Sequence, residues 1–240
     1  MAARTLVIIP AFNEEESLPA VLATLRAGVP DFDVLVVDDG SVDRTTDVAI
    51  AAGVRVARLP FNLGIGGALR TGFRHAVQHG YDRAIQFDAD GQHEVTELAP
   101  MLGDLDNGAD LVVGTRFAPH PAAYRPGIIR GGAMNVLRLA VAILSGRQFS
   151  DTSSGFRAFS RPMLEYFAHT YPVEYMDSVE ALLLACYAGF TVIERPVVMH
   201  ERSAGRPSTR NLKLVYHYMR LIVVLFAMAS LRQRRGARAT

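Results

Sequence analysis

The sequence predicts an α/β domain with a mainly parallel central sheet, helices on both faces of that sheet, and amphipathic helices towards the C-terminus. Short apolar runs alternate with longer amphipathic segments along the first half of the chain, as strands and helices do around a parallel sheet. The apolar runs are continuous, which is typical of strands buried on both faces. Polar clusters follow these runs, at the edge where such sheets bind ligands.

The first half of the chain is expected to form alternating strands and helices. The expected strands are residues 6–9, 34–37, 54–59, 85–87 and 111–114, and the expected helices are 14–27, 45–52, 66–79 and 94–105. In the first helix Leu18, Leu22 and Leu25 share one face, and acidic residues occupy the first turn. Asp43 is expected to cap the second helix.

The second half is less regular. We expect helices at residues 131–144, 161–169 and 177–189, a turn-rich segment at 150–155, and strands at 191–194 and 197–200 separated by Pro196. The sequence shows neither an internal repeat nor a low-complexity linker. It therefore predicts one domain over residues 1–206 and a helical tail over 207–240.

Composition limits the classes of protein that the chain can belong to. Half of the 240 residues are hydrophobic, which excludes a disordered protein, and the net charge of +1 gives no case for a nucleic-acid partner. The single cysteine, Cys186, excludes an intramolecular disulfide framework. Basic residues are almost all arginine, which suits phosphate contacts but also fits a codon bias, the reading we favour for surface arginines.

Two apolar segments bear on membrane attachment. Residues 6–9 are too short for a secretory signal and are stopped by Pro10. Residues 221–231 reach only about half the length of a spanning helix, and basic residues follow them. This pattern predicts a helix that lies on a membrane surface, or one that packs on the domain or on a second subunit; both interpretations stay open.

Asp88 and Asp90 directly follow the strand expected at residues 85–87. Residues at i and i+2 of a strand point to the same side, so the two carboxylates can form a site for a divalent cation that also binds phosphate oxygens. On its own, Asp-x-Asp is more often an ordinary turn.

Three further polar clusters favour a ligand site at the same edge. They are Asn13-Glu14 after the first strand, Asp38-Asp39 after the second, and residues 62–67 after the third. Asp38 and Asp39 have no basic neighbour in sequence before Arg44, so we interpret them as acceptors for a base or ribose; helix capping is the structural alternative. Residues 64–67 do not match G-x-G-x-x-G because Leu69 holds the last position, and they allow either a close ligand or a tight turn.

Five motifs in order resemble the family 2 glycosyltransferases of GT-A fold, most closely the dolichol- or polyprenol-phosphate mannosyl and glucosyl synthases. The motifs are PAFNE at 10–14, VVDDGSxDxT at 36–45, DADGQH at 88–93, GTR at 114–116 and SGFR at 154–157, and the resemblance covers residues 5–210. It implies an inverting hexosyltransferase that uses a nucleotide-diphosphate sugar and Mg²⁺ or Mn²⁺.

The resemblance also implies roles for individual residues on the donor side. Asp90 and Gln92 match metal ligands, and Asp90 also counts as catalytic. The residues that match nucleotide contacts are Pro10, Ala11, Phe12, Glu14, Asp38 or Asp39 for the base, Gly64, Asp88 near the ribose, and Ala89.

On the acceptor side, the resemblance places Arg116 and Arg130 at the lipid phosphate. Arg202 is the expected cation for the donor diphosphate, because Thr209 stands where the family commonly has lysine. Asp177 or Glu180 would be the base for a hydroxyl acceptor, although Asp177 can equally be a helix cap.

The implied partners are a nucleotide-diphosphate sugar, a polyprenyl phosphate and a membrane surface, with a membrane protein partner or a homodimer left open. The expected location is cytoplasmic, peripheral on the cytoplasmic face of the membrane. The alternatives are a glycosyltransferase with a hydroxyl acceptor and a non-catalytic nucleotide-sugar-binding module.

Overall fold

The computed structural model describes residues 3–117, 128–173 and 177–200, without the side chains of residues 128–136 and 177. The chain divides into two compact units. The first comprises residues 1–125 and 150–205, and the second comprises residues 126–149 and 206–240. The predicted boundary at residue 206 stays a prediction.

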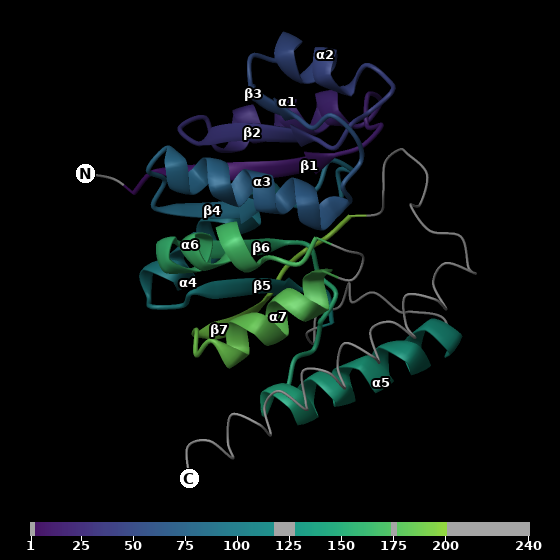
Figure 1. Cartoon of the computed structure of the whole chain (residues 1–240), viewed down its shortest axis with the longest axis vertical. Coiled ribbons are helices and arrows are strands. Elements are labelled where there is room, and N and C mark those ends of the chain that lie inside the picture. The colour runs from purple at the N-terminus through teal and green to yellow at the C-terminus, as the bar shows by residue number, and fades with distance from the viewer. Residues whose placement is uncertain (1–2, 118–127, 174–176, 201–240) are drawn as a thin grey trace. The chain divides into compact units, whose positions relative to one another are not determined.

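The first unit is built on a seven-stranded sheet in the order β3-β2-β1-β4-β6-β5-β7 (Figure 1). Every neighbouring pair is parallel except those that β6 makes with β4 and β5. The strands are β1 Thr5–Ala11, β2 Asp33–Asp38, β3 Arg55–Arg58, β4 Arg83–Gln86, β5 Leu111–Thr115, β6 Arg157–Ser160 and β7 Val192–Pro196. The predicted mainly parallel sheet is confirmed.

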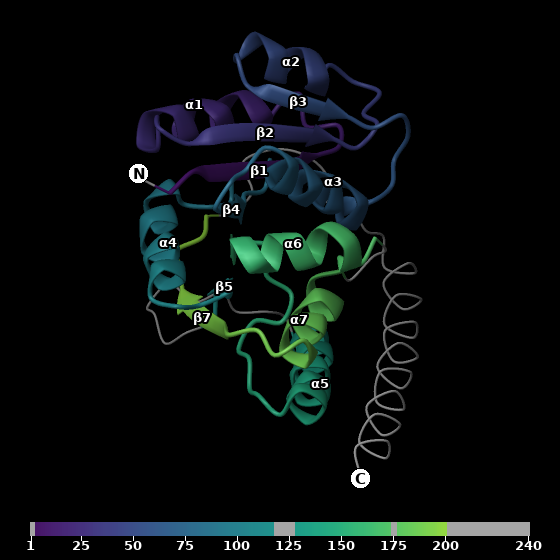
Figure 2. The same cartoon turned by 60° about the vertical axis from the view of Figure 1, so that its left-hand side comes forward.

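Helices cover both faces of this sheet. They are α1 Leu18–Gly28, α2 Thr45–Ala51, α3 Ile65–Gln78, the 3-10 helix η1 Val95–Glu97, α4 Leu98–Asp106, α6 Arg161–Thr170 and α7 Asp177–Tyr187. Figures 1 and 2 show α1 and α4 on one face, and α3 and α6 on the other.

The core is built on β1, whose successive side chains point to opposite faces of the sheet and whose residues Leu6 to Ile9 are all fully buried. Val7 and Ile9 pack with α1 and α4. The opposite face holds an aromatic cluster in which the Phe73 ring lies 4.8 Å from that of Phe159 and 5.1 Å from that of Tyr171. Burial of each such side chain stabilises the fold by about 1.5–3 kcal/mol, so packing on both faces holds the sheet in place.

Two expectations about elements were wrong and one strand was missed. The first helix begins at Leu18 and not at residue 14, where the backbone N–H groups of Glu14 and Glu15 donate to the side chains of Thr45 and Asp43. Strand β6 was not expected at all. Residues 197–200 form no named strand, and there only Met199 makes an isolated bridge, to His93.

Two other elements agree with expectation in part. Asp43 accepts a hydrogen bond from the backbone N–H of Thr45 at 3.0 Å, but Arg44 holds the N-cap position of α2. The helix expected at 94–105 begins with η1, where Glu94 accepts a hydrogen bond from Thr96 N.

The described helix of the second unit is α5, Ile128–Ser145, which was expected at 131–144. Leu137 and Val141 are buried whereas Leu139 and Ile143 are exposed, so this helix carries apolar side chains on its exposed side as well as on its buried side. The apolar segment at 221–231 lies outside the described residues. Among the helices that the structure describes, none combines the length and the apolar character needed to cross a bilayer.

Candidate active site

The loops after β1 and β2 are joined by hydrogen bonds at the carboxyl edge of the sheet. Asp39 N donates to Ala11 O at 2.9 Å, Asn13 N donates to Ser41 Oγ at 3.0 Å, and Val42 N donates to Asn13 Oδ1 at 3.0 Å. Asn13 has φ 56°, a left-handed conformation that asparagine tolerates. The two loops therefore form one fixed surface.

Asp39 fixes the loop after β3 to this surface. Its carboxylate accepts hydrogen bonds from Leu63 N at 2.7 Å and Gly64 N at 2.9 Å. The side chain is almost fully buried, and this desolvation raises the pKa of Asp39 although the two N–H groups oppose the shift. Three of the four predicted loops are thus connected.

Asp38 is engaged within the protein. It is fully buried, and its carboxylate accepts hydrogen bonds from Ser41 N at 2.8 Å and from Thr46 Oγ1. Arg58 Nε lies 3.9 Å from Asp38 Oδ2, so the inference that no cation pairs with this carboxylate was wrong. The cation comes from the adjacent strand β3, which the spacing in sequence does not reveal.

The remaining residues predicted at the nucleotide are spread along the same edge. Pro10 and Ala11 end β1, Phe12 is 44% exposed, and the Glu14 carboxylate accepts a hydrogen bond from Ser17 Oγ. Gly64 has φ 85°, and a Cβ at Gly66 would lie 2.1 Å from Pro172 O. Gly66 is therefore explained by packing within the protein.

His93 lies beside Asp88. Asp88 N donates to His93 Nδ1 at 3.1 Å, so Nδ1 carries no proton, and Nε2–H faces Asp88 Oδ2 across a longer 3.4 Å. The imidazole is fully buried and stacks on Phe156 with ring centroids 4.3 Å apart. Burial lowers the pKa of His93, against the raising effect of Asp88 and Asp90, which makes the neutral ring the favoured form.

Gly155 brings a second loop against Asp88. A Cβ at this position would lie 2.9 Å from Asp88 Oδ2 and 2.9 Å from Gln86 Nε2, so any larger residue would have to displace the ends of these two side chains. Gln86 Nε2 donates to Asp88 Oδ1 at 3.3 Å. In the sequence this segment is recognisable only as turns and as part of the SGFR motif.

Asp90 and Gln92, the predicted metal ligands, lie two residues apart in the loop after β4 and both carry side-chain oxygen atoms that can bind a divalent cation. Asp90 Oδ1 accepts a hydrogen bond from Gln92 N at 3.0 Å, and Gln92 Nε2 donates to His200 O at 3.3 Å. No group of three or more His, Cys, Asp or Glu side chains that could hold a metal occurs among the described residues. The donor set fits Mg²⁺ or Mn²⁺ bound by one or two side chains and completed by substrate phosphates.

Arg116 forms a bidentate ion pair with Asp151. Nε and Nη2 lie 2.8 and 3.1 Å from the two oxygens of Asp151, whose side chain is fully buried. Glu194 accepts hydrogen bonds from the backbone N–H groups of Ser150 and Asp151. Arg116 directly follows β5, and because β6 is antiparallel to both β4 and β5, the carboxyl ends of β4 and β5 lie at the same edge of the sheet.

The structure describes only part of the predicted acceptor side. Of its residues, Glu180 lies on α7, whereas on the donor side Ala89 is buried beside Asp88. The side chains of Arg130 and Asp177, and all of Arg202, lie outside the described residues.

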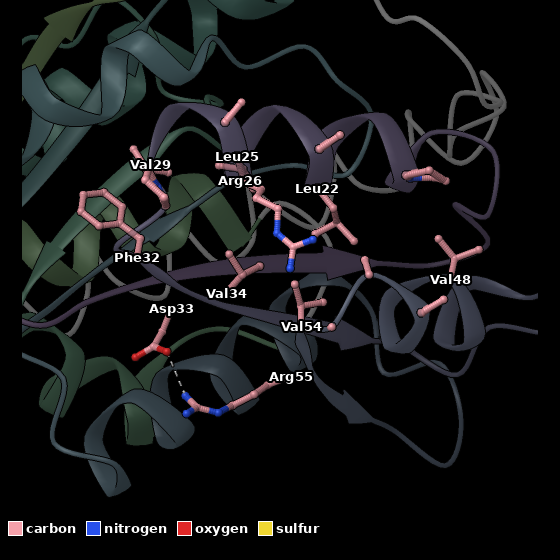
Figure 3. Close-up of a pocket in the computed structure, with 17 residues that line it drawn as sticks. Leu22, Leu25, Arg26, Val29, Phe32, Asp33, Val34, Val48, Val54 and Arg55 are labelled. Carbon is pink, nitrogen blue, oxygen red and sulfur yellow. Dashed lines mark ion pairs between the residues drawn. The ribbon is translucent and has the colours of Figure 1, made fainter.

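A cavity of about 850 Å³ lies elsewhere, between α1, α2 and the first residues of β2 and β3 (Figure 3). It is lined by apolar side chains such as Leu22 and Val34, with the Asp33–Arg55 ion pair at 3.4 Å on its wall. None of the predicted site residues lines it. It opens among the amino ends of the strands and is not part of the candidate site.

Comparison with known sequences gives one family. The profile described as "Glycosyl transferase family 2" matches residues 6–167. A polyprenol monophosphomannose synthase of Mycolicibacterium smegmatis is 33% identical over 216 residues, 84% of this chain and 79% of the relative. An undecaprenyl-phosphate mannosyltransferase of Micrococcus luteus is 34% identical over 84% of this chain and 86% of the relative.

Comparison with solved structures gives the same architecture. Glucosyl-3-phosphoglycerate synthase of Mycobacterium tuberculosis, in complex with phosphoglyceric acid, matches with a TM-score of 0.74 at 22% identity over 95% of this chain and 80% of that chain. The same enzyme with Mn²⁺, uridine diphosphate and glucosyl-3-phosphoglycerate matches with a TM-score of 0.71 at 22% identity, over 94% and 79% of the two chains. The expected GT-A fold is confirmed.

Proposed function

The chain belongs to glycosyl transferase family 2, and from that membership we propose that it moves a hexose from a nucleotide-diphosphate sugar to a polyprenyl phosphate, with inversion and with Mg²⁺ or Mn²⁺. Membership makes the chain an enzyme, a glycosyltransferase, so the non-catalytic alternative is set aside. The observation that carries the proposal is that Asp88 and Asp90, beside buried His93, and Arg116, paired with Asp151, follow β4 and β5 at the same carboxyl edge of the sheet.

On the donor side, the surface formed by the loops after β1, β2 and β3 would hold the nucleoside, with Asp39 fixing its shape. Asp90 and Gln92 would hold the metal ion, which when bound neutralises the charge of the departing diphosphate. Support for the ion comes from structural relatives solved with Mn²⁺ or Mg²⁺ and uridine diphosphate. Neutral His93, which accepts a hydrogen bond from the backbone N–H of Asp88, would keep Asp88 in place.

On the acceptor side, a phosphate monoester is already an anion near neutral pH, because its second pKa is about 6. It needs a cationic cradle and correct placement more than a general base. Arg116, fixed by Asp151, is the described residue that we assign to that cradle, and Arg130 is its proposed partner. The names of the two mannosyltransferase relatives support a lipid phosphate as acceptor.

A hydroxyl acceptor is the second candidate. It is favoured by the likeness to an enzyme solved with phosphoglyceric acid, a soluble acceptor. In that case Asp177 or Glu180 would act as the base, and a lipid phosphate would not be used.

The test is to incubate the purified protein with Mg²⁺ or Mn²⁺, a panel of nucleotide sugars, and either short-chain polyprenyl phosphates or phosphorylated and plain hydroxyl acceptors. We expect glycosyl polyprenyl phosphate, with inverted anomeric configuration by NMR. Transfer to hydroxyl acceptors alone would replace the proposal by its alternative. A lipid acceptor also implies that the enzyme works at a membrane surface, which we propose to be the cytoplasmic face; a membrane protein partner or a second copy of the chain could assist there.

A further inference from the structure

Arg157 is a buried charge that the site as described so far does not use. It is the first residue of β6 and is fully buried. Its Nη1 has no hydrogen-bond partner, and the structure shows no ion pair for it in the described part of the chain. A buried guanidinium without a carboxylate is less favourable than an apolar side chain of similar volume. A contribution to stability alone therefore does not explain why an arginine occupies this buried position.

The two hydrogen bonds of Arg157 go to different parts of the fold. Nε donates to Ser154 O at 2.9 Å, which closes the turn over residues 154–157. Nη2 donates to Ser178 O at 2.8 Å, in the first turn of α7. One rigid guanidinium thus joins this turn to the start of α7.

The turn that Arg157 closes packs on the donor side of the site. It contains Gly155, where an added Cβ would lie 2.9 Å from Asp88 Oδ2. In the antiparallel ladder Arg157 stands opposite Gln86, which donates to the other oxygen of Asp88 at 3.3 Å. A shift of Arg157 would therefore move groups that touch Asp88 directly.

We propose that Arg157 is a positioning residue that fixes the first turn of α7 relative to Asp88. Helix α7 carries Asp177 and Glu180, the two candidate bases for a hydroxyl acceptor. The inference rests on the proposed function, because that function places the donor at Asp88 and the acceptor phosphate at Arg116, which donates to Ser153 Oγ at 3.2 Å just before the turn that Arg157 closes. Among the described residues Arg157 donates to backbone carbonyls alone, so we assign it no contact with substrate.

This role predicts a separation between binding and turnover. In the described part of the chain no hydrogen bond joins Arg157 to the donor loops after β1, β2 and β3, so these loops should keep their affinity for the nucleotide, and only the contact at Asp88 should shift. Turnover should depend on it strongly, because a misplacement of about 1 Å between reacting groups costs about 100-fold in rate.

The test compares Arg157→Lys with a matched control, Arg161→Lys, in the full chain. Lysine keeps the charge but lacks the planar fork that reaches two carbonyls. Arg161 follows the other end of β6 and likewise donates to two backbone carbonyls, Tyr81 O at 2.9 Å and Val77 O at 3.3 Å. For Arg157→Lys we expect kcat to fall by about 10- to 100-fold with the nucleoside diphosphate affinity and donor KM within about twofold of the parent. Arg161→Lys should leave kcat and KM unchanged.

Amide hydrogen exchange gives a second readout that needs no acceptor. Exchange at residues 151–156 and 178–184 should be faster in Arg157→Lys than in the parent and in Arg161→Lys. Equal kcat losses in both variants, parental turnover in Arg157→Lys, or an equal loss of donor affinity would overturn the inference.

Failure of the proposed acceptor gives a different result. If the parent transfers sugar only to a hydroxyl, the lipid proposal fails, and the same kcat comparison with that hydroxyl decides the role of Arg157. If the parent shows no transfer at all, the exchange comparison decides it: unchanged exchange in Arg157→Lys would contradict the link between the turn and α7.

Discussion

Asp151 holds the Arg116 guanidinium from a fully buried position. The two form parallel N–H···O bonds, a geometry that fixes direction as well as distance. Glu194 in turn receives the backbone N–H groups around Asp151. The direction of the proposed phosphate-binding cation is therefore set by residues far from it in sequence.

Asp151→Asn tests this arrangement. The substitution removes the counter-charge of Arg116 and should lower the free energy of unfolding by about 1–3 kcal/mol. It should also raise the KM for the acceptor phosphate several-fold, with donor affinity unchanged, because Arg116 loses its fixed direction. Steady-state kinetics and chemical denaturation measure both effects.

The matched control is Asp104→Asn, which breaks the comparable bidentate pair of Arg195 outside the site. It should affect stability but not the acceptor KM. Equal KM changes in the two variants would show that Asp151 has no special relation to the acceptor.

Residue roles differed in how far the sequence revealed them. Asp88 and Asp90 were predicted as site residues from their spacing after an expected strand, and Gln92 from the family resemblance; in the structure β4 ends at Gln86, so both aspartates lie in the loop that follows it. His93 belonged to the DADGQH motif but received no role, because its buried stacking on Phe156 depends on a segment about 60 residues later. Arg58 opposite Asp38 was missed for the same reason.

At the scale of elements, α3 ends in a pair of histidines that are separate from the site. His75 and His79 stack with ring centroids 3.9 Å apart, and His75 Nε2 is buried without a hydrogen-bond partner. Burial lowers the pKa of His75, and the charges of His79 and Arg55 lower it further. Folding therefore disfavours the protonated form.

This shift gives a pH dependence with a definite sign. Below the unfolded value of about 6.5, the unfolded chain binds a proton at His75 that the folded chain does not, so stability falls as pH falls through that range. Between pH 7.5 and pH 5.5, the melting temperature of His75→Gln should fall by less than that of the parent. Calorimetric scans at the two pH values measure this, and an equal fall of the melting temperature in His75→Gln and in the parent would contradict it.

The elements also show what the sequence could and could not predict. Strands β1, β2 and β5 were recognised because they are continuous apolar runs buried on both faces. Strand β6 has only four residues and begins with an arginine, so its place in the middle of the sheet was not visible. Residues 197–200 begin with an apolar run like that of a strand, but β7 ends at Pro196, and beyond it the chain makes a single isolated bridge, between Met199 and His93, beside hydrogen bonds between His200 and Gln92.

The whole molecule joins a donor surface of three connected loops to a second loop cluster around Asp88. The antiparallel strand β6 links the two halves of the sheet, since it pairs with both β4 and β5. Through β6 the donor side is held against Arg116, Asp151 and the start of α7. This arrangement explains how Asp88, Arg116 and Asp151, which are far apart in sequence, are brought together in the first unit of the chain.

The central claim is a metal-dependent sugar transfer to polyprenyl phosphate at the Asp88–Asp90 edge. The most direct measurement is the initial rate of glycolipid formation at saturating Mg²⁺ or Mn²⁺ for the parent, for Asp90→Asn, and for Asp47→Asn as a control on α2. We predict that Asp90→Asn lowers the rate by about 100-fold or more and that chelation of the metal does the same in the parent, while Asp47→Asn has no effect. Parental rates in Asp90→Asn, or transfer that continues without a divalent ion, would contradict the claim.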